Sequence, residues 1–490
     1  MSDPQIIAKN SVKSTGWNLS ANIFMTLCSF LRIYILARLV SVETYGVYGK
    51  ALSFVFIAIP FLYLGHGTAM LHRAPETEDE ENSATVLFTL CLITSFVWAI
   101  LMVLAANLFF DLTNPTTKVA FYALIFAEAF SNTASTPRIL FARKVDFKRQ
   151  AIITFVQELI GIILAVVLAK LGAGIWALVS ANLVPSITSF VLLYFWRPIF
   201  YPRLNWQPGV VKYFFRFGSK VASESLIYNL QERIDDLWVA SYLGSTAAGF
   251  YTQAHIIARY PLKIFSTPVI NVASGTFNAL KNDKNALGQS FETVCSFLSR
   301  LTFFIGGAIF LISQEFVVIY LGDKWLPLLN AMRIMVAYMM IEPIKEAFSK
   351  LFSAIGHPEL ALRARIWQLL CLVAGIAIFS WWLPWEIEGV ALAVNISILV
   401  GLLIMIFLLR PHQKVSWKMI FGAPVLAVTL AAVVSVGVFS QVHFESVWIS
   451  ALSKLGIWSM VYWLVEFIFD RKYLADLLRI MRKYMLKKAA

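Results

Sequence analysis

Ionisable side chains are concentrated in one apolar segment near the middle of the chain, residues 218–242. The ionisable residues of this segment are Glu224, Glu232, Arg233, Asp235 and Asp236. Glu224, Tyr228, Gln231 and Asp235 recur at spacings of three and four, so they share one face of a helix. A charged side chain inside an apolar segment is costly and typically lines a cavity or a pathway. Carboxylates in such a place can bind or relay cations, which makes them candidates for ion coupling.

The next apolar segment, residues 247–270, carries a basic stripe. Its members are His255, Arg259 and Lys263, spaced by four. Arg233 and Arg259 each lie about a dozen residues from the connection between the two segments, roughly 17 Å at the helical rise. Two interpretations remain open. The acidic and basic groups either form structural ion pairs between neighbouring helices or line a hydrated cavity, and five ionisable groups on one helix favour the cavity.

Other apolar segments hold further charges. Glu342 and Lys345 lie in a late segment, where the alternative to a cavity is a lysine that extends to the membrane interface. Arg32 lies well inside the first apolar segment. Glu128 and Glu158 are isolated, and each is either a packing partner or a cavity residue.

Signatures of catalysis are absent from the sequence. It has no Walker lysine motif, no H-E-x-x-H, no nucleotide-binding glycine pattern and no nucleophile elbow. The six histidines are scattered, and the four cysteines lie in apolar segments without metal-ligand or disulfide spacing. We therefore expect no enzyme activity, no catalytic residue, no metal and no cofactor. Transport by such a chain would be driven by an ion gradient, by a partner or by consumption of the product downstream.

The composition explains where these charges lie. Of the 490 residues 59% are hydrophobic and 14% are charged, whereas soluble domains average about 45–50% and about 25%. Almost the whole chain must therefore lie in a lipid bilayer. The net charge of +13 fits basic cytoplasmic loops better than nucleic-acid binding, because the basic residues cluster in alternate connections.

A span needs about 20 apolar residues, and fourteen segments qualify. They are 14–40, 44–71, 83–109, 118–140, 151–171, 175–196, 218–242, 247–270, 291–312, 327–355, 364–383, 387–409, 418–440 and 447–469. The alternation of basic connections predicts that both termini are cytoplasmic. Two basic amphipathic segments, 203–217 and the tail from Asp470, are typical of helices that lie on an anionic membrane surface. For the tail, the alternative is a solvated basic end.

A short internal repeat indicates how the spans are grouped. The stretch Gly46-Val-Tyr-Gly-Lys-Ala51 and the stretch Gly249-Phe-Tyr-Thr-Gln-Ala254 lie 203 residues apart, each at the start of the second span of a predicted half. Parallel repeats of this kind occur in transporters that hold substrate between two halves. We predict an all-α polytopic membrane protein with two six-helix lobes, residues 1–196 and 218–409, joined by a cytoplasmic amphipathic linker, 197–217. Spans thirteen and fourteen follow in residues 410–469, and residues 470–490 form a basic cytoplasmic tail.

Several connections resemble those of a known family. The stretches are Phe141-Ala-Arg-Lys-Val-Asp-Phe147, Ser241-Tyr-Leu-Gly-Ser-Thr-Ala-Ala-Gly-Phe-Tyr251 and Tyr320-Leu-Gly-Asp-Lys-Trp325. They are similar to the Wzx-type polysaccharide flippases of the MOP exporter superfamily, especially the colanic acid exporter branch. Phe30–Arg38 also looks like the first helix of the related lipid II flippases, in which a cavity arginine occupies the position of Arg32.

The resemblance implies a MATE-like fold with alternating access in a bacterial inner membrane. It implies a substrate of undecaprenyl-diphosphate-linked oligosaccharide for surface polysaccharide synthesis, with the polysaccharide polymerase machinery and membrane lipid as partners. We hypothesise that Arg32, Arg233, Arg259 and Lys263 bind the diphosphate, because arginine offers bidentate contacts to phosphate. The candidates for ion coupling or for lining the cavity are Glu224, Glu232, Asp235, Asp236, His255, Glu342 and Lys345. The alternatives are a multidrug cation antiporter of the same superfamily, a lipid II flippase and a non-transporting scaffold.

Overall fold

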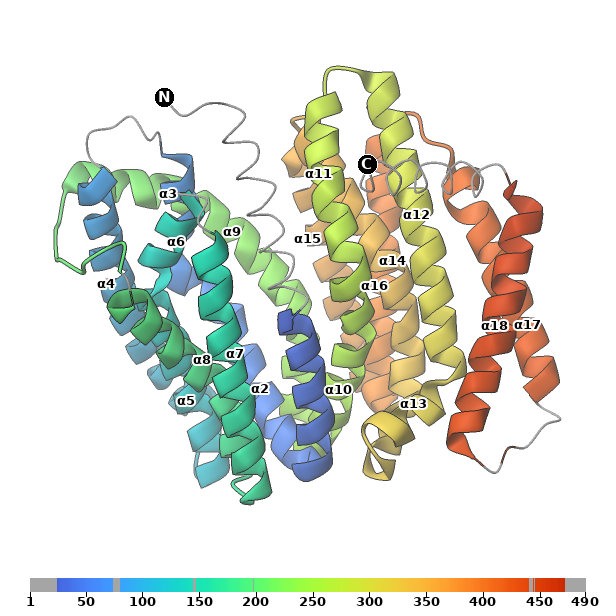
Figure 1. Ribbon diagram of the computed structural model, residues 1–490, viewed down its shortest axis with the longest axis horizontal. Coiled ribbons are helices and arrows are strands. Elements are labelled where there is room, and N and C mark those ends of the chain that lie inside the picture. The colour runs from blue at the N-terminus through green and yellow to red at the C-terminus, as the bar shows by residue number, and fades with distance from the viewer. Residues whose placement is uncertain are drawn as a thin grey trace, which may run out of the picture. The chain divides into compact units, whose positions relative to one another are not determined.

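The computed structural model describes residues 24–73, 80–143, 147–196, 198–439, 444 and 446–471. Every regular element within these ranges is a helix (Figure 1). The chain divides into two compact units, Met1–Thr252 (unit 1) and Gln253–Ala490 (unit 2). The predicted tail helix, 470–490, lies outside the described residues except for its first two positions.

Unit 1 begins with a helix over residues 24–39. The elements that follow are α2 (Val42–Tyr63), α3 (His66–His72), α4 (Glu80–Phe109), α5 (Pro115–Thr133), α6 (Ser135–Arg143), α7 (Phe147–Lys170), α8 (Ile175–Phe195), α9 (Pro208–Trp238), the π-helix η1 (Val239–Leu243) and the first half of α10 (Ser245–Pro261). Local chemistry sets several of these boundaries. Ser41 Oγ accepts from the backbone N–H of Thr44, and Asn114 Oδ1 accepts from that of Thr116, as helix N-caps do.

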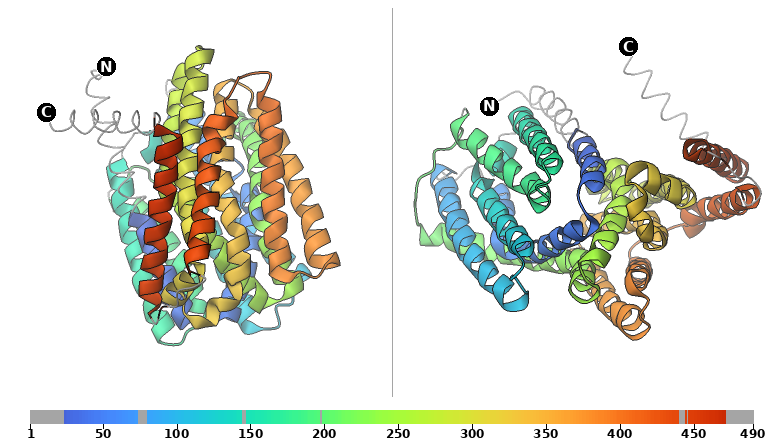
Figure 2. Two further views of the ribbon diagram at one scale, coloured as in Figure 1. Left: turned by 90° about the vertical axis from the view of Figure 1, so that its right-hand side faces the viewer. Right: turned by 90° about the horizontal axis from the view of Figure 1, so that it is seen from below.

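Unit 2 contains the rest of α10 and a series of long helices. They are η2 (Leu262–Ser266), α11 (Thr267–Leu280), α12 (Lys284–Leu311), α13 (Ser313–Tyr320), η3 (Asp323–Leu328), α14 (Leu329–Ala354), α15 (Pro358–Ile376), η4 (Ala377–Trp382), α16 (Glu386–Leu409), η5 (Lys418–Gly422), α17 (Ala423–Phe439) and α18 (Val447–Phe469). Figure 2 shows α17 and α18 side by side, and both pack against α12.

Each of the fourteen predicted spans coincides, in its described part, with one helix or with consecutive helical elements. Within the described residues, nine helices are long and apolar enough to cross a membrane. The chain is therefore a multi-pass membrane protein. The charged helices α9 and α14 are not among the nine, because their ionisable residues lower the apolar character on which such an assignment depends. The full count of fourteen spans stays a prediction.

The predicted linker 197–217 differs from the structure in its second half. Helix α9 begins at Pro208, so residues 208–217 are continuous with the seventh predicted span. Val211 and Phe214 are buried and belong to the same core cluster as Phe141 of α6. These apolar side chains face protein, which explains why the segment continues a packed helix.

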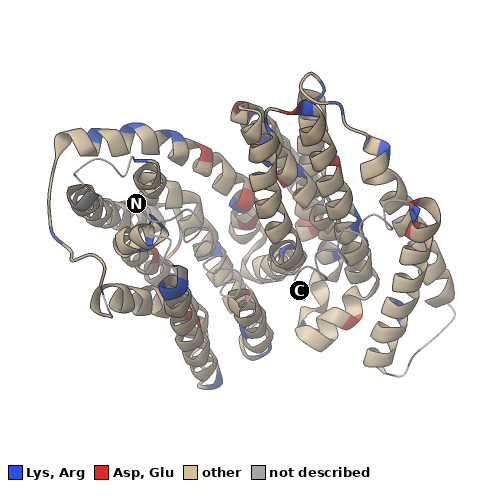
Figure 3. Ribbon diagram, turned by 45° about the horizontal axis from the view of Figure 1, so that its top comes forward, with Lys and Arg blue, Asp and Glu red and all other residues tan. Residues whose placement is uncertain are grey.

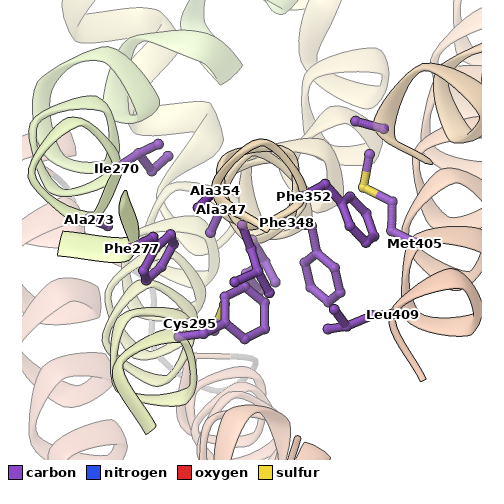
Figure 4. Packing of buried hydrophobic residues seen from close by; sticks show 14 of the residues in the cluster. Ile270, Ala273, Phe277, Cys295, Ala347, Phe348, Phe352, Ala354, Met405 and Leu409 are labelled. Atoms are coloured by element: carbon purple, nitrogen blue, oxygen red, sulfur yellow. The ribbon is translucent and has the colours of Figure 1, made fainter. Parts of the chain in front are cut away.

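The core of unit 2 surrounds α14. Phe348 packs edge-on against Phe291 of α12, with ring centroids 4.9 Å apart. Figure 4 shows Phe348 and Phe352 extending from the central helix toward Met405 and Leu409. Burial of these apolar side chains, at about 25 cal/mol per Å² of apolar area, stabilises the packing of α14 against its neighbours.

The two halves of the internal repeat contact each other within unit 1. A Cβ on Gly46 would meet the backbone oxygen of Ser245, and a Cβ on Gly249 would meet that of Val42. Val42 and Ser245 are themselves 203 residues apart, the offset of the repeat. The contact is thus reciprocal, and glycine permits the close approach of the two helix starts.

Candidate functional site

The acidic residues at the end of α9 form a buried cluster in unit 1. The side chains of Asp235 and Asp236 are only 1% and 2% exposed. The Tyr251 hydroxyl of α10 donates to Asp235 Oδ2 at 2.6 Å, and Arg233 Nη1 donates to Asp236 Oδ2 at 3.2 Å. Carboxylate oxygens of this kind are ligands for hard cations. The cluster lies directly before η1, and π-helical turns are frequent at functional sites.

The residues of the predicted polar face of α9 differ in their exposure to solvent. Gln231 and Asp235 are buried with Glu232, whereas Glu224 and Tyr228 are exposed. Figure 3 shows both basic and acidic residues along this helix. The guanidinium carbon of Arg233 lies 5.2 Å from the ring centroid of Phe56 on α2, a cation–π contact. The dense charge predicted from the sequence is therefore gathered at the C-terminal end of α9.

Arg32 has a carboxylate partner that sequence reasoning left unassigned. Its Nη1 lies 3.9 Å from Glu158 Oε2 of α7 and 3.4 Å from the backbone oxygen of Ala181 in α8. Both side chains are partly buried, at 21% and 14% exposure. Glu158 therefore forms a long ion pair with Arg32.

Arg138 of α6 is a polar residue that the sequence analysis missed. Its Nη2 donates to Ser189 Oγ of α8 at 2.6 Å, and its Nη1 donates to Ser131 Oγ of α5 at 3.3 Å. Glu128, one turn before Ser131, interacts electrostatically with Arg138. The available signal was that Glu128 and Arg138 are the only charged residues of the predicted span 118–140 apart from Lys118 at its start.

The basic stripe of α10 faces α14 in unit 2. The His255 ring lies edge-on to Tyr338, with centroids 5.8 Å apart. The guanidinium carbon of Arg259 lies 5.9 Å from the centroid of the same ring. Lys263, the third member, has a side chain outside the described part of the structure. Two of the three predicted basic residues are thus brought to one aromatic ring.

Three of the charged residues of α14, Glu342, Lys345 and Glu346, form ion pairs. Lys345 is fully buried, and its Nζ lies 2.7 Å from Glu342 Oε2 and 2.8 Å from Gln368 Oε1 of α15. Arg365 Nη2 lies 2.6 Å from Glu346 Oε1. The interpretation of Lys345 as a lysine that extends to the interface is wrong, because its ammonium group has buried oxygen partners.

Three ion pairs that could not be seen in the sequence attach α18 and the residue that follows it, Asp470, to the rest of unit 2. Arg300 of α12 contacts Glu466 through Nε at 3.1 Å and also contacts Asp470. Lys454 pairs with Glu315 of α13. Glu466 and Lys454 are the only charged residues within α18, and that isolation was the available signal.

Comparison with known proteins agrees with this architecture. The sequence profile described as "polysaccharide biosynthesis protein" matches residues 35–330. The chain is 20% identical over 381 residues to the lipopolysaccharide biosynthesis protein WzxC of Escherichia coli (strain K12), covering 76% of this chain and 75% of that protein.

Two solved structures have a similar fold. One is the lipid II flippase MurJ in an inward closed conformation, with a TM-score of 0.74, 16% identity, and coverage of 94% of this chain and 99% of that chain. The other is a multidrug resistance MATE family transporter of the MOP superfamily in an inward-facing conformation. Its TM-score is 0.65 at 16% identity, with 81% of this chain and 98% of that chain covered. The predicted all-helical, MATE-like membrane fold is confirmed.

Proposed function

We propose, on the premise that this chain belongs to the polysaccharide biosynthesis protein family, that it flips an undecaprenyl-diphosphate-linked oligosaccharide across a bacterial inner membrane. The resemblance to flippases noted from the loop motifs is confirmed by the family match, and the chain is a membrane transporter rather than an enzyme. The family match carries this proposal. The relative in Escherichia coli is named for lipopolysaccharide biosynthesis, and one structural neighbour is named a flippase.

The physical demands of such a substrate match the types of residue found inside the helices. A diphosphate needs cations, and guanidinium groups provide paired N–H donors for phosphate oxygens. We propose Arg32 and Arg259 as headgroup ligands, with Arg233 and Lys263 contributing charge. The long distance between Arg32 and Glu158, 3.9 Å, supports this role because a long ion pair is replaced by phosphate at small cost.

The buried acids support a separate role in energy coupling. Asp235 is held by the Tyr251 hydroxyl and Asp236 by Arg233, so a cation or proton that binds there would alter the contact between α9 and α10. We propose Asp235, Asp236 and Glu232 as the coupling group, with Glu224 and His255 lining the aqueous path. For Glu342 and Lys345 we propose a structural role. Each compensates the charge of the other within α14, and Lys345 also bonds to Gln368 of α15.

The proposed topology has fourteen spans in two lobes, 1–196 and 218–409, and both termini in the cytoplasm. Alternating access would expose the headgroup site first to the cytoplasmic leaflet and then to the outer leaflet. The polyprenyl chain would stay in the lipid while the sugar crosses through the polar interior. Polymerase machinery on the outer side is the partner that would consume the product.

The direct test is a flipping assay in liposomes. Purified protein is reconstituted, a polyprenyl-diphosphate oligosaccharide is placed in one leaflet, and an impermeant glycosidase on the other side reports its arrival. We expect arrival to rise with the amount of protein and to fall at least tenfold for Arg32→Ala and Arg259→Ala, a loss of about 1.4 kcal/mol or more. No protein-dependent arrival, with several sugars and a pH gradient tried, would contradict the proposal.

The same liposomes distinguish the alternatives. Exchange of an organic cation for protons, without sugar arrival, would identify a small-solute antiporter. Preferential transport of lipid II would identify a lipid II flippase, and absence of all transport would favour a scaffold.

A further inference from the structure

The partners of Arg138 set it apart from Arg32 and Arg233, the two arginines of unit 1 that the proposed function assigns to headgroup binding or to its charge. Arg32 and Arg233 each have a carboxylate within 4.0 Å, at 3.9 Å and 3.2 Å. Arg138 has two hydroxyl partners, Ser131 Oγ and Ser189 Oγ. Among the residues that the structure describes, it has no carboxylate within ion-pair distance. Its positive charge is therefore solvated by neutral groups.

A half-buried arginine with neutral partners is costly for a membrane protein. Hydroxyl groups can accept its hydrogen bonds, but they leave its net charge uncompensated in a medium of low dielectric. A structural tie between α5, α6 and α8 would need no charge, because a neutral donor could bridge the two serines equally well. The guanidinium is the group that binds the planar face of a phosphate through two parallel N–H donors.

Glu128 offsets part of the charge of Arg138 when the cluster is empty. It interacts electrostatically with Arg138 without reaching ion-pair distance. An arriving anion would therefore be attracted by Arg138 and opposed by Glu128. This arrangement makes the two residues separable by experiment, since a ligand site and a structural pair predict different effects of Glu128.

The predicted topology places the cluster near the cytoplasmic membrane interface. Arg138 lies five residues before Arg143, the end of α6, which is about 8 Å at the helical rise. Arg143 donates to the backbone oxygens of Met70 and Arg73, at the end of α3. The predicted cytoplasmic connection with Lys144, Lys148 and Arg149 follows. A lipid phosphate in the cytoplasmic leaflet would lie at this depth.

We propose that Arg138, Ser131 and Ser189 form an entry site for the lipid-borne diphosphate at the cytoplasmic end of unit 1. This inference rests on the proposed function and adds a binding step before the headgroup reaches Arg32. Arg138 binds a phosphate oxygen pair, and the two serines orient the guanidinium for that contact. Glu128 weakens the binding enough for the lipid to move on.

The test measures binding of undecaprenyl diphosphate to the full chain in detergent, by the ligand-dependent rise of its melting temperature. Undecaprenol is the uncharged comparison and phosphatidylglycerol is the ordinary anionic lipid. The variants are Arg138→Gln, Arg138→Lys and the isosteric Glu128→Gln. Arg410→Gln is the matched control, because it removes an exposed positive charge from another predicted cytoplasmic connection.

We expect Arg138→Gln to weaken diphosphate binding by about tenfold to one-hundredfold, the range for hydrogen bonds to a charged group. Arg138→Lys should retain part of the affinity, and Arg410→Gln should retain all of it. Glu128→Gln should bind more tightly than the wild type. Opposite effects of Arg138→Gln and Glu128→Gln would support an anion site.

Three results would overturn the inference. One is unchanged diphosphate affinity in folded Arg138→Gln or, if that variant does not fold, a Glu128→Gln variant that binds no more tightly. Another is a loss of melting temperature without ligand that is equal in Arg138→Gln and Glu128→Gln, which indicates a structural pair. The third is equal Arg138-dependent binding of phosphatidylglycerol, which assigns the site to bulk lipid. Failure of the wild-type chain to flip any substrate would instead contradict the proposed function.

Discussion

The buried basic residues Arg300 and Lys345 of unit 2 have closer carboxylate partners than Arg32 and Arg138 of unit 1. In unit 2, Arg300 contacts Glu466 and Asp470, and Lys345 contacts Glu342 and Gln368. In unit 1, Arg32 reaches its carboxylate only at 3.9 Å, and Arg138 is held by two serine hydroxyls. Arg300 thus joins α12 to α18 through a tight carboxylate contact, and Lys345 is neutralised by Glu342 within α14 while it bonds to Gln368 of α15. Arg32 and Arg138 of unit 1 are incompletely neutralised by comparison.

This difference in neutralisation indicates which basic residues are available to bind an anionic ligand. A buried ion pair already satisfies both charges, so an anion would have to break it, at a cost of several kcal/mol. A cation with hydroxyl partners or a distant carboxylate is electrostatically available to a phosphate. We therefore expect substitutions in the two groups to separate stability from substrate binding.

The largest loss of stability is expected for Arg300→Met. It leaves Glu466, whose side chain is 0% exposed, as an uncompensated charge, and breaking such a pair costs about 3–5 kcal/mol. Unfolding in mixed micelles with increasing SDS measures the change. The double variant Arg300→Met/Glu466→Leu is the control, and it should recover most of the loss. A loss of unfolding free energy below about 1 kcal/mol in the single variant would contradict the comparison, since solvent-exposed ion pairs contribute that little to stability.

A somewhat smaller loss is expected for Lys345→Met, at the lower end of about 3–5 kcal/mol, because one carboxylate rather than two loses its partner. The same unfolding experiment measures it, with Lys345→Met/Glu342→Gln as the matched variant. If the double variant folds stably but loses transport, the pair belongs to the coupling machinery and the structural interpretation is wrong.

Unit 1 should lose much less stability when Arg138 is replaced. Arg138→Gln removes two hydrogen bonds from a charged donor, each worth about 1.5–3 kcal/mol, but it also removes the cost of a positive charge that has no carboxylate within ion-pair distance, which offsets most of the loss. We expect the net change in unfolding free energy to be about 1 kcal/mol. A loss as large as that of Arg300→Met would show that Arg138 is a structural residue.

The smallest effect is expected for Glu158→Gln. Its distance of 3.9 Å from Arg32 and the partial exposure of both side chains limit the stability loss to about 1 kcal/mol or less. Removal of the competing carboxylate should strengthen diphosphate binding, as in Glu128→Gln. Titration with undecaprenyl diphosphate measures it, and weaker binding would contradict the role proposed for Arg32.

Much of the fold could be predicted because a continuous apolar segment of about 20 residues can pair its backbone N–H and C=O groups within a bilayer only by forming a helix. The repeat around Gly46 and Gly249 was also visible, although only the structure shows that its two copies pack on each other. Partners of single charges could not be predicted. The pairing of Arg300 with Glu466 joins residues 166 positions apart, and Arg138 depends on serines of two other helices.

The central claim is that the incompletely neutralised arginines of unit 1 bind substrate while the tight pairs of unit 2 hold the fold. The most direct measurement is the flipping rate per folded protein for Arg32→Gln, Arg138→Gln and the double variant Arg300→Met/Glu466→Leu in the same liposomes. We predict that both unit 1 variants lose at least tenfold in rate, about 1.4 kcal/mol, and that the unit 2 variant keeps the wild-type rate. Normal flipping by both unit 1 variants, with loss of flipping in the folded unit 2 variant, would contradict the account.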